Sequence, residues 1–160
     1  MTYYIGCSGF YYKEWKEIFY PSGMPAKDWF QYYCRHFNTI EINASFYRAP
    51  ALKTLQNWYN QSPGDFLFSV KAPKYITHIK RFELDKEEVN AFGNLMAAGL
   101  QHKLANILYQ LPPSFTYTPY QLDLICRKVD NGFNNIIEFR HESWWQQEVY
   151  DRLSQGEITF

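Results

Sequence analysis

The sequence predicts an α/β protein of the TIM (β/α)8-barrel type, with about five to six of the eight strand-helix units present in this chain. Three observations lead to this fold. Short apolar runs that close on polar residues recur about every 31 residues, the size of one strand-helix-strand step. A segment with helix-like character follows each of the first five runs. Within several runs, polar and apolar side chains alternate, which places a polar set on one face of the sheet.

The apolar runs are the predicted strands, and the alternation with helices makes the sheet parallel. The runs are YYIGCS from Tyr3, NTIEIN from Asn38, FLFSVK from Phe66, ANILYQ from Ala105 and NNIIEF from Asn134, with EITF at Glu157 as the start of another.

Helices are predicted between these runs from apolar spacing and from start and stop signals. The first covers residues 27–36, with an aromatic face, and the second runs from about Pro50 to the Ser62-Pro63-Gly64 turn. The third covers residues 85–98, with acidic residues in its first turn. A fourth is capped by Thr118 and runs to Asn131-Gly132. The last covers residues 142–153, with Trp144, Trp145, Val149 and Leu153 facing inward.

Composition and charge set limits on partners and location. A content of 46% hydrophobic and 20% aromatic residues in 160 residues predicts one folded domain, residues 1–160. Sixteen basic and sixteen acidic residues cancel, so there is no strong signal for nucleic acid or an anionic membrane. The start of the chain lacks the pattern of a signal peptide, and no window resembles a membrane span. We therefore expect a cytoplasmic protein without membrane contact, with its three cysteines reduced.

Alternation within the strands distinguishes a barrel from an open sheet. Ile40 and Ile42 lie on one face and Glu41 on the other, and Ile137 likewise opposes Glu138. An open sheet covered by helices on both sides would need apolar residues on both faces. A barrel instead points the polar set inward, toward the mouth at the carboxyl ends of its strands.

The candidate site is the polar set at this mouth. Two carboxylates on different strands, Glu41 and Glu138, could serve as general acid and base, and Lys71 with Arg140 could stabilise developing negative charge. Further polar side chains at or just past the strand ends are candidate ligand contacts, namely Ser8, Asn43, Ser45 and Gln110. The competing interpretation is a buried ion-pair network of Glu41, Lys71, Glu138 and Arg140 that only neutralises itself.

The segment KAPKYITHIKR, residues 71–81, carries four positive charges and His78 without an acidic residue. Because it follows a predicted strand, Lys74 and its neighbours could bind a phosphate or sugar-phosphate at the same mouth. Alternatively, the acidic residues between Glu83 and Glu88 simply pair with it.

Other features suggest chemistry less directly. Glu41, His78, Glu138 and His141 could supply metal ligands, but no tight spacing motif supports a metal, so none is assigned and the cofactor stays unknown. The aromatic loop with Phe10, Tyr11, Tyr12 and Trp15 could be a stacking platform for a base or sugar, or a lid over the core. Cys7 alternates to the outward face and is not expected to be a nucleophile.

At these residues the chain resembles the YecE-like family, domain of unknown function seventy-two, over essentially all 160 residues. The resemblance rests on YIGCSGFYYKEW, FNTIEINASFYRAP, FLFSVKAPKYITH, ILYQLPPSF and IIEFRHESWW, in this order. It implies a TIM barrel, without implying an activity. By motif, it places the polar mouth at Ser8, Glu41, Asn43, Ser45, Tyr47, Lys71, Thr77, His78, Gln110, Glu138, Arg140, His141 and Trp144. Family members continue for further strands, so the resemblance also implies a C-terminally incomplete barrel here.

Three functional hypotheses follow. The first is a barrel enzyme acting on a phosphorylated or sugar-like metabolite, or on a nucleic-acid phosphodiester. The second is a non-catalytic module that binds a nucleotide or RNA, and the third is an inactive truncated remnant. Unpaired strand edges also predict self-association of the chain.

Overall fold

The computed structural model describes residues 3–129 and 132–160. Its five strands form one parallel sheet in the order β1-β2-β3-β4-β5. The strands are β1 (Thr39–Ile42), β2 (Leu67–Lys71), β3 (Leu104–Gln110), β4 (Asn135–Glu138) and β5 (Ile158–Thr159). Each strand lies next to the one that follows it in the sequence, as in a barrel. In an open doubly wound sheet, by contrast, the strand order would reverse near the centre of the sheet. The α/β fold and the predicted strands from residue 38 onward are confirmed.

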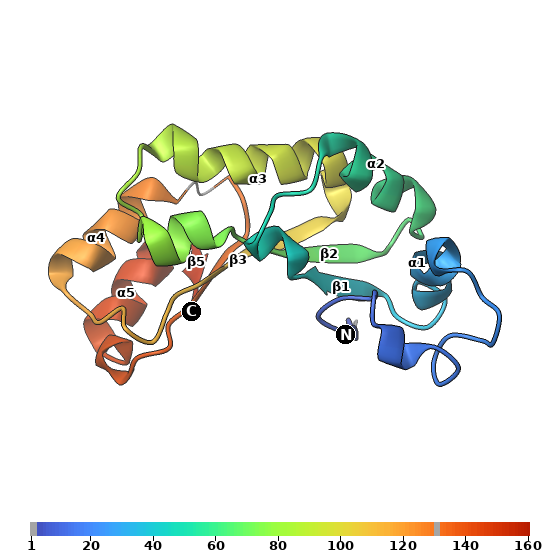
Figure 1. Ribbon diagram of the computed structural model, residues 1–160. Coiled ribbons are helices and arrows are strands. Elements are labelled where there is room, and N and C mark those ends of the chain that lie inside the picture. The colour runs from blue at the N-terminus through green and yellow to red at the C-terminus, as the bar shows by residue number, and fades with distance from the viewer. Residues whose placement is uncertain (1–2, 130–131) are drawn as a thin grey trace.

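Five α-helices alternate with the strands in the described residues: α1 (Trp29–Tyr33), α2 (Leu52–Gln61), α3 (Lys86–Leu100), α4 (Pro119–Lys128) and α5 (Gln147–Gln155). Figure 1 shows α2 and α3 along one side of the sheet, α1 beyond its β1 end, and α4 and α5 toward β4 and β5. Short helical turns complete the connections: η1 (Lys13–Trp15), η2 (Ala26–Asp28), η3 (Ala44–Phe46), η4 (Tyr75–Ile79), η5 (Gln101–Lys103) and η6 (Glu142–Trp144).

The two faces of the sheet differ as the alternation predicts. Side chains on the helix-covered face are buried, including Ile40, Val70 and Ile137. Glu41 and Glu138, which point to the other face, are only partly covered. Burial of the apolar face against the helices is the main stabilising contribution, so it fixes the polar face toward the barrel interior.

Helix starts follow from local sequence. Asp85 and Glu88 form a capping box at the start of α3, and Thr118 Oγ1 accepts the Gln121 N–H at 3.1 Å at the start of α4, whose first residue is a proline. The predicted end of the fourth helix at Asn131-Gly132 is wrong, since α4 ends at Lys128. Residue 131 itself lies outside the described residues.

The predicted first strand is not a regular strand. Residues 3–8 run beside β1, where Glu41 N–H donates to the Cys7 carbonyl at 3.1 Å. Other bonds come from side chains: Asn38 bonds the backbone of Tyr3 and Ile5, each at 2.8 Å, and Tyr33 OH accepts the Cys7 N–H. These side-chain bonds replace ladder hydrogen bonds, so the segment is held at the sheet edge without strand geometry.

The last predicted helix is divided into two. η6 ends at Trp144, and α5 begins only at Gln147, because Trp145 has a non-helical backbone and is 62% exposed. The expectation that Trp145 faces inward is therefore wrong, whereas Trp144, Val149 and Leu153 are fully buried. Within the described residues, no helix combines the length and apolar character that crossing a membrane requires.

Candidate functional site

Three predicted site residues on neighbouring strands form one hydrogen-bonded chain at the carboxyl end of the sheet. Lys71, the last residue of β2, donates from Nζ to Gln110 Oε1 at 2.8 Å. Gln110, the last residue of β3, donates from Nε2 to both carboxylate oxygens of Glu138, at 2.8 and 2.9 Å. Strand register explains the meeting, because Gln110 and Glu138 are paired residues of β3 and β4. We call these three residues the mouth relay.

The mouth relay has a fixed polarity. Lys71 can only donate and the ionised Glu138 can only accept, so the amide of Gln110 must direct its oxygen to the lysine and its nitrogen to the carboxylate. The amide therefore separates the two charges while remaining bonded to both. A ligand that reaches the relay meets an ammonium at one end and a carboxylate at the other.

An aromatic ring supports the cationic end of the relay. Phe46, in η3, places its ring 4.9 Å from Lys71 Nζ, and the His78 ring packs edge-on against it at a centroid distance of 4.9 Å. The distance to the ammonium suits a cation–π contact. Lys71 and His78 therefore both contact the ring of Phe46.

His78 lies in a positively charged environment. It belongs to η4, a π-helical turn of the kind that is often found at functional sites. Burial, followed by the charges of Lys71, Arg140 and Arg81, lowers the pKa of His78 below its usual value. These influences disfavour the imidazolium form of the ring. Of these three cations, Lys71 shares contact with the Phe46 ring.

Outside the relay, the charged candidates are spread along the mouth. Arg140 is exposed just after β4. Lys74 is also exposed and places its Nζ 5.6 Å from the ring centre of Tyr47, itself 76% exposed. Glu41 lies one register position below the strand end, paired with Ser69 of β2, and among the described residues its carboxylate makes no hydrogen bond or ion pair with the relay. The mouth therefore has one carboxylate inside the relay and one outside it.

The self-neutralising ion-pair network is not what the described residues form. Their ion pairs within 4.0 Å are all at exposed positions, and none involves Glu41, Lys71, Glu138 or Arg140. Nor do the acidic residues after η4 pair with the basic segment 71–81, since Glu83 accepts from Tyr120 OH and Glu88 belongs to the capping box. The positive charge of this segment therefore remains available.

Four residues that the sequence predicts to contact a ligand make contacts within the fold. Ser45 is fully buried, and its hydroxyl bonds the carbonyls of Ile42 and Lys71, at 2.7 and 2.6 Å. Thr77 is also buried, with Oγ1 2.9 Å from His78 Nδ1. Both side chains position parts of the mouth and are not open to a ligand.

The remaining two lie at the two ends of η6. His141 Nδ1 accepts the Ser143 N–H at 3.2 Å, which caps this turn. Trp144 is fully buried, and its indole N–H donates to the Phe115 carbonyl at 2.7 Å. This corrects the placement of Trp144 among mouth residues, because its ring belongs to the core, stacked on Phe139.

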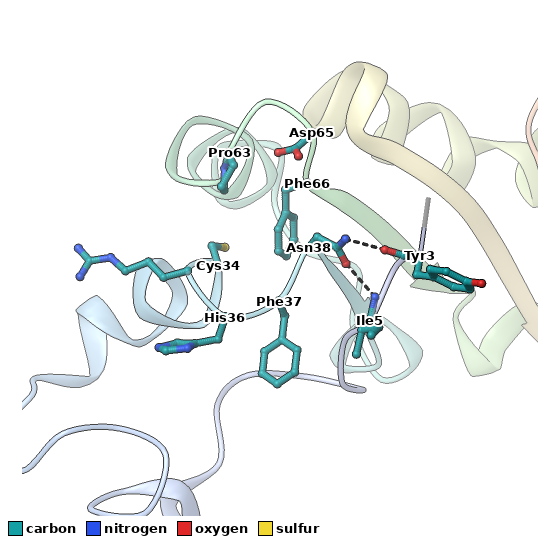
Figure 2. A pocket seen from close by; sticks show the side chains of 10 residues that line it. Tyr3, Ile5, Cys34, His36, Phe37, Asn38, Pro63, Asp65 and Phe66 are labelled. Atoms are coloured by element: carbon teal, nitrogen blue, oxygen red, sulfur yellow. Dashed lines mark hydrogen bonds between the residues drawn. The ribbon is translucent and has the colours of Figure 1, made fainter. Parts of the chain in front are cut away.

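The last two candidates, Ser8 and Asn43, line a separate aromatic pocket next to the end of β1. Another cavity, of about 330 Å³, lies at the opposite end of the strands. Figure 2 shows it around Asn38, which bonds Tyr3 and Ile5, with Cys34 and Phe66 nearby. Since the amino-terminal end of a barrel serves stability, we assign this cavity to the fold and not to the site.

Two residues at the mouth were not nominated from the sequence. Phe46 could have been found as the aromatic residue of the ASF segment directly after β1. Arg81 was counted in the basic segment, yet its influence on His78 depends on η4 and on the left-handed backbone of Arg81 and Phe82, with φ of 49° and 65°. Among the described residues, no group of three or more histidine, cysteine or acidic side chains could hold a metal ion.

A family model described as "Protein of unknown function DUF72" matches residues 4–160. The chain belongs to the DUF72 family. Among curated DUF72 relatives, it is 30% identical over 158 residues to the UPF0759 protein YunF of Bacillus subtilis, covering 93% of this chain and 54% of that protein. It is 29% identical over 128 residues to the UPF0759 protein YecE of Escherichia coli, covering 78% of this chain and 46% of that protein.

Solved DUF72 structures agree with the fold. The Thermotoga maritima DUF72 family protein TM1631 superposes with a TM-score of 0.82 at 28% identity, over 97% of this chain and 62% of that one. A DUF72 family protein of Enterococcus faecalis has a TM-score of 0.73 at 20% identity, covering 97% of this chain and 60% of that one, which supports the fold alone. The chain spans about half the length of the curated relatives it matches, and so comprises part of a DUF72 barrel.

Proposed function

We propose that this DUF72 chain contributes to an enzyme site for a small phosphorylated or sugar-like metabolite, centred on the mouth relay. The observation that carries the proposal is the relay itself, in which Lys71, Gln110 and Glu138 from three adjacent strands are joined by hydrogen bonds at the carboxyl end of the sheet. Barrel enzymes place their reacting groups at this end.

Each part of the relay has a chemical role in this proposal. Lys71, with Arg140 and the basic residues of the 71–81 segment, attracts an anionic group such as a phosphate. Glu138 supplies a carboxylate for proton transfer. Gln110 is a positioning residue, because it holds the ammonium and the carboxylate at a fixed separation. Burial and positive neighbours disfavour the protonated form of His78, and a bound anion favours it, which makes the ring a better donor.

Inorganic phosphate tests the anion-binding part of the proposal. Replacing Lys71 by Met removes the ammonium that faces the relay, so we expect phosphate affinity at pH 7.5 to fall about tenfold or more by calorimetric titration. The matched control is Lys53→Met, which removes one exposed positive charge from α2, away from the mouth. Equal affinities in wild type and Lys71→Met would contradict the proposal.

Glu138→Gln separates an enzyme from a binding protein. Glutamine can still accept the Gln110 N–H through its side-chain oxygen but cannot take up a proton as a carboxylate does. Phosphate affinity that is retained or increased in Glu138→Gln, together with loss of turnover on a phosphate-ester panel, supports an enzyme. Turnover equal to that of wild type would remove Glu138 from the proposed reaction.

A further inference from the structure

Exposed aromatic and cationic residues alternate along the loops that follow β1 and β2, at the rim of the mouth. In order they are a ring, a cation, a ring and two cations, namely Tyr47, Lys74, Tyr75, Lys80 and Arg81. The first residue follows η3, and the other four belong to η4 or flank it. We call these five residues the rim strip. It contains no residue of the mouth relay.

Contacts between neighbours make the rim strip one surface. Lys74 places its Nζ 5.6 Å from the ring centre of Tyr47, and Lys80 places its Nζ 5.8 Å from that of Tyr75. Both distances suit a cation–π contact. Lys74 and Tyr75 are consecutive in the sequence, as are Lys80 and Arg81. Contacts and chain together therefore link all five residues.

Burial of the residues between them keeps the rim strip at the surface. Within η4, Ile76 is buried while its neighbour Tyr75 is exposed. After η4, Phe82 has a left-handed backbone and a fully buried ring. The Arg81 side chain before it donates from Nη2 to Ser114 Oγ at 3.2 Å. The rim strip is thus anchored to the core and to the loop after β3.

The cations of the rim strip are not neutralised. Among the described residues, no ion pair within 4.0 Å involves Lys74, Lys80 or Arg81. Glu83, the nearest acidic residue along the chain, accepts from Tyr120 OH instead. Since acidic and basic residues cancel over the whole chain, only a local cluster of this kind can attract an anionic partner.

We propose that the rim strip binds single-stranded nucleic acid, with bases stacked on its two tyrosine rings and phosphates beside its three cations. Surfaces that bind single strands combine cations along the backbone with rings on which bases stack. The alternation of ring and cation in the rim strip matches the alternation of base and phosphate. A duplex stacks its bases on one another and can use only the cations. An acidic peptide likewise offers charge without a series of flat rings.

Labelled oligo(dT) and oligo(U) of about twelve nucleotides test this inference by fluorescence anisotropy, and their comparison distinguishes DNA from RNA. We expect at least one of them to bind more tightly than a duplex of the same length. Replacing Tyr47 and Tyr75 together by Ala should weaken binding about tenfold or more, whereas Phe at both positions keeps the rings and the affinity. Tyr3→Ala is the matched control, because Tyr3 is 71% exposed and lines the cavity at the opposite end of the strands.

Salt dependence tests the cations. Replacing Lys74 and Lys80 together by Met removes two phosphate contacts, so the slope of log affinity against log salt concentration should become less steep by about 1.4. Lys53→Met, at an exposed position of α2, should leave the slope unchanged.

Three results would overturn the proposal. The first is no binding of either strand at about 0.1 mM protein and about 50 mM salt. The second is equal affinity in wild type and the double tyrosine-to-alanine variant, which would show a general polyanion surface. The third is duplex binding as tight as that of the single strands. None of these results changes the phosphate titration of Lys71→Met, so this inference and the proposed function can fail separately.

Discussion

Replacing Lys103 by Met is expected to lower the free energy of unfolding by about 3 kcal/mol. Lys103 is only 4% exposed, and its ammonium donates to the carbonyls of Tyr59 and Ser62 and to the Ser62 hydroxyl, at 2.6, 2.9 and 2.9 Å. These acceptors lie at the carboxyl end of α2, where the helix dipole also favours a positive charge. The ammonium lies 4.5 Å from the ring centre of Tyr59 as well. Methionine fills similar space but leaves the Ser62 carbonyl without this donor, and the Tyr59 carbonyl keeps only the Ser62 hydroxyl, at 3.1 Å.

Chemical denaturation of wild type and Lys103→Met measures this effect. Lys53→Met is again the matched control, because it removes an exposed lysine from α2, the helix whose carboxyl end Lys103 contacts, and should change stability by no more than about 0.5 kcal/mol. Similar small effects of both substitutions would show that the buried ammonium does not secure the end of α2.

Gly99→Ala should also destabilise the protein, by roughly 1–3 kcal/mol. Alanine is the better helix former, so propensity alone predicts a gain in stability. In the structure, however, a Cβ at Gly99 would lie 2.3 Å from Leu55 Cβ, and Leu55 is fully buried between α2 and α3. The clash is with an atom fixed to the backbone, so relief requires the two helices to separate.

Gly64→Ala is the control for this prediction. A Cβ added at Gly64 would have no other atom within 4 Å, and the φ of this glycine is outside the left-handed region. Its substitution should therefore be close to neutral in the same denaturation experiment. A stabilising effect of Gly99→Ala would mean that α2 and α3 do not approach as closely as described.

Periodicity predicted the parallel sheet and its helices because burial of one apolar face is a repeated, local signal. The segments TIEI and NIIE could be assigned to strands, and their faces distinguished, from alternation alone. The first segment and the start of the last helix could not be assigned in this way. Residues 3–8 depend on side-chain bonds from Asn38 and Tyr33, and the break at Trp145 depends on packing of its neighbour Trp144.

The site was predictable to the extent that strand ends determine it. Lys71, Gln110 and Glu138 could be placed at one edge, because parallel strands end together, but their bonding through the glutamine depends on register and rotamers. Asn43 and Ser8 were grouped with them, although the aromatic loop separates these two into another pocket. Self-association through the sheet edges stays a prediction, and size-exclusion chromatography is the measurement that would check it.

The central proposal is that an anion binds at the mouth beside Lys71 and His78, which both contact the Phe46 ring. Its most direct test is an NMR titration of the His78 ring with and without sulfate, which keeps its charge over the relevant pH range. Without sulfate, burial and the positive neighbours Lys71, Arg140 and Arg81 hold the pKa of His78 below its usual value. A bound dianion favours the imidazolium, so sulfate should raise this pKa, and by linkage sulfate should bind more tightly as the pH falls through it. A His78 titration that does not change at saturating sulfate would contradict the claim.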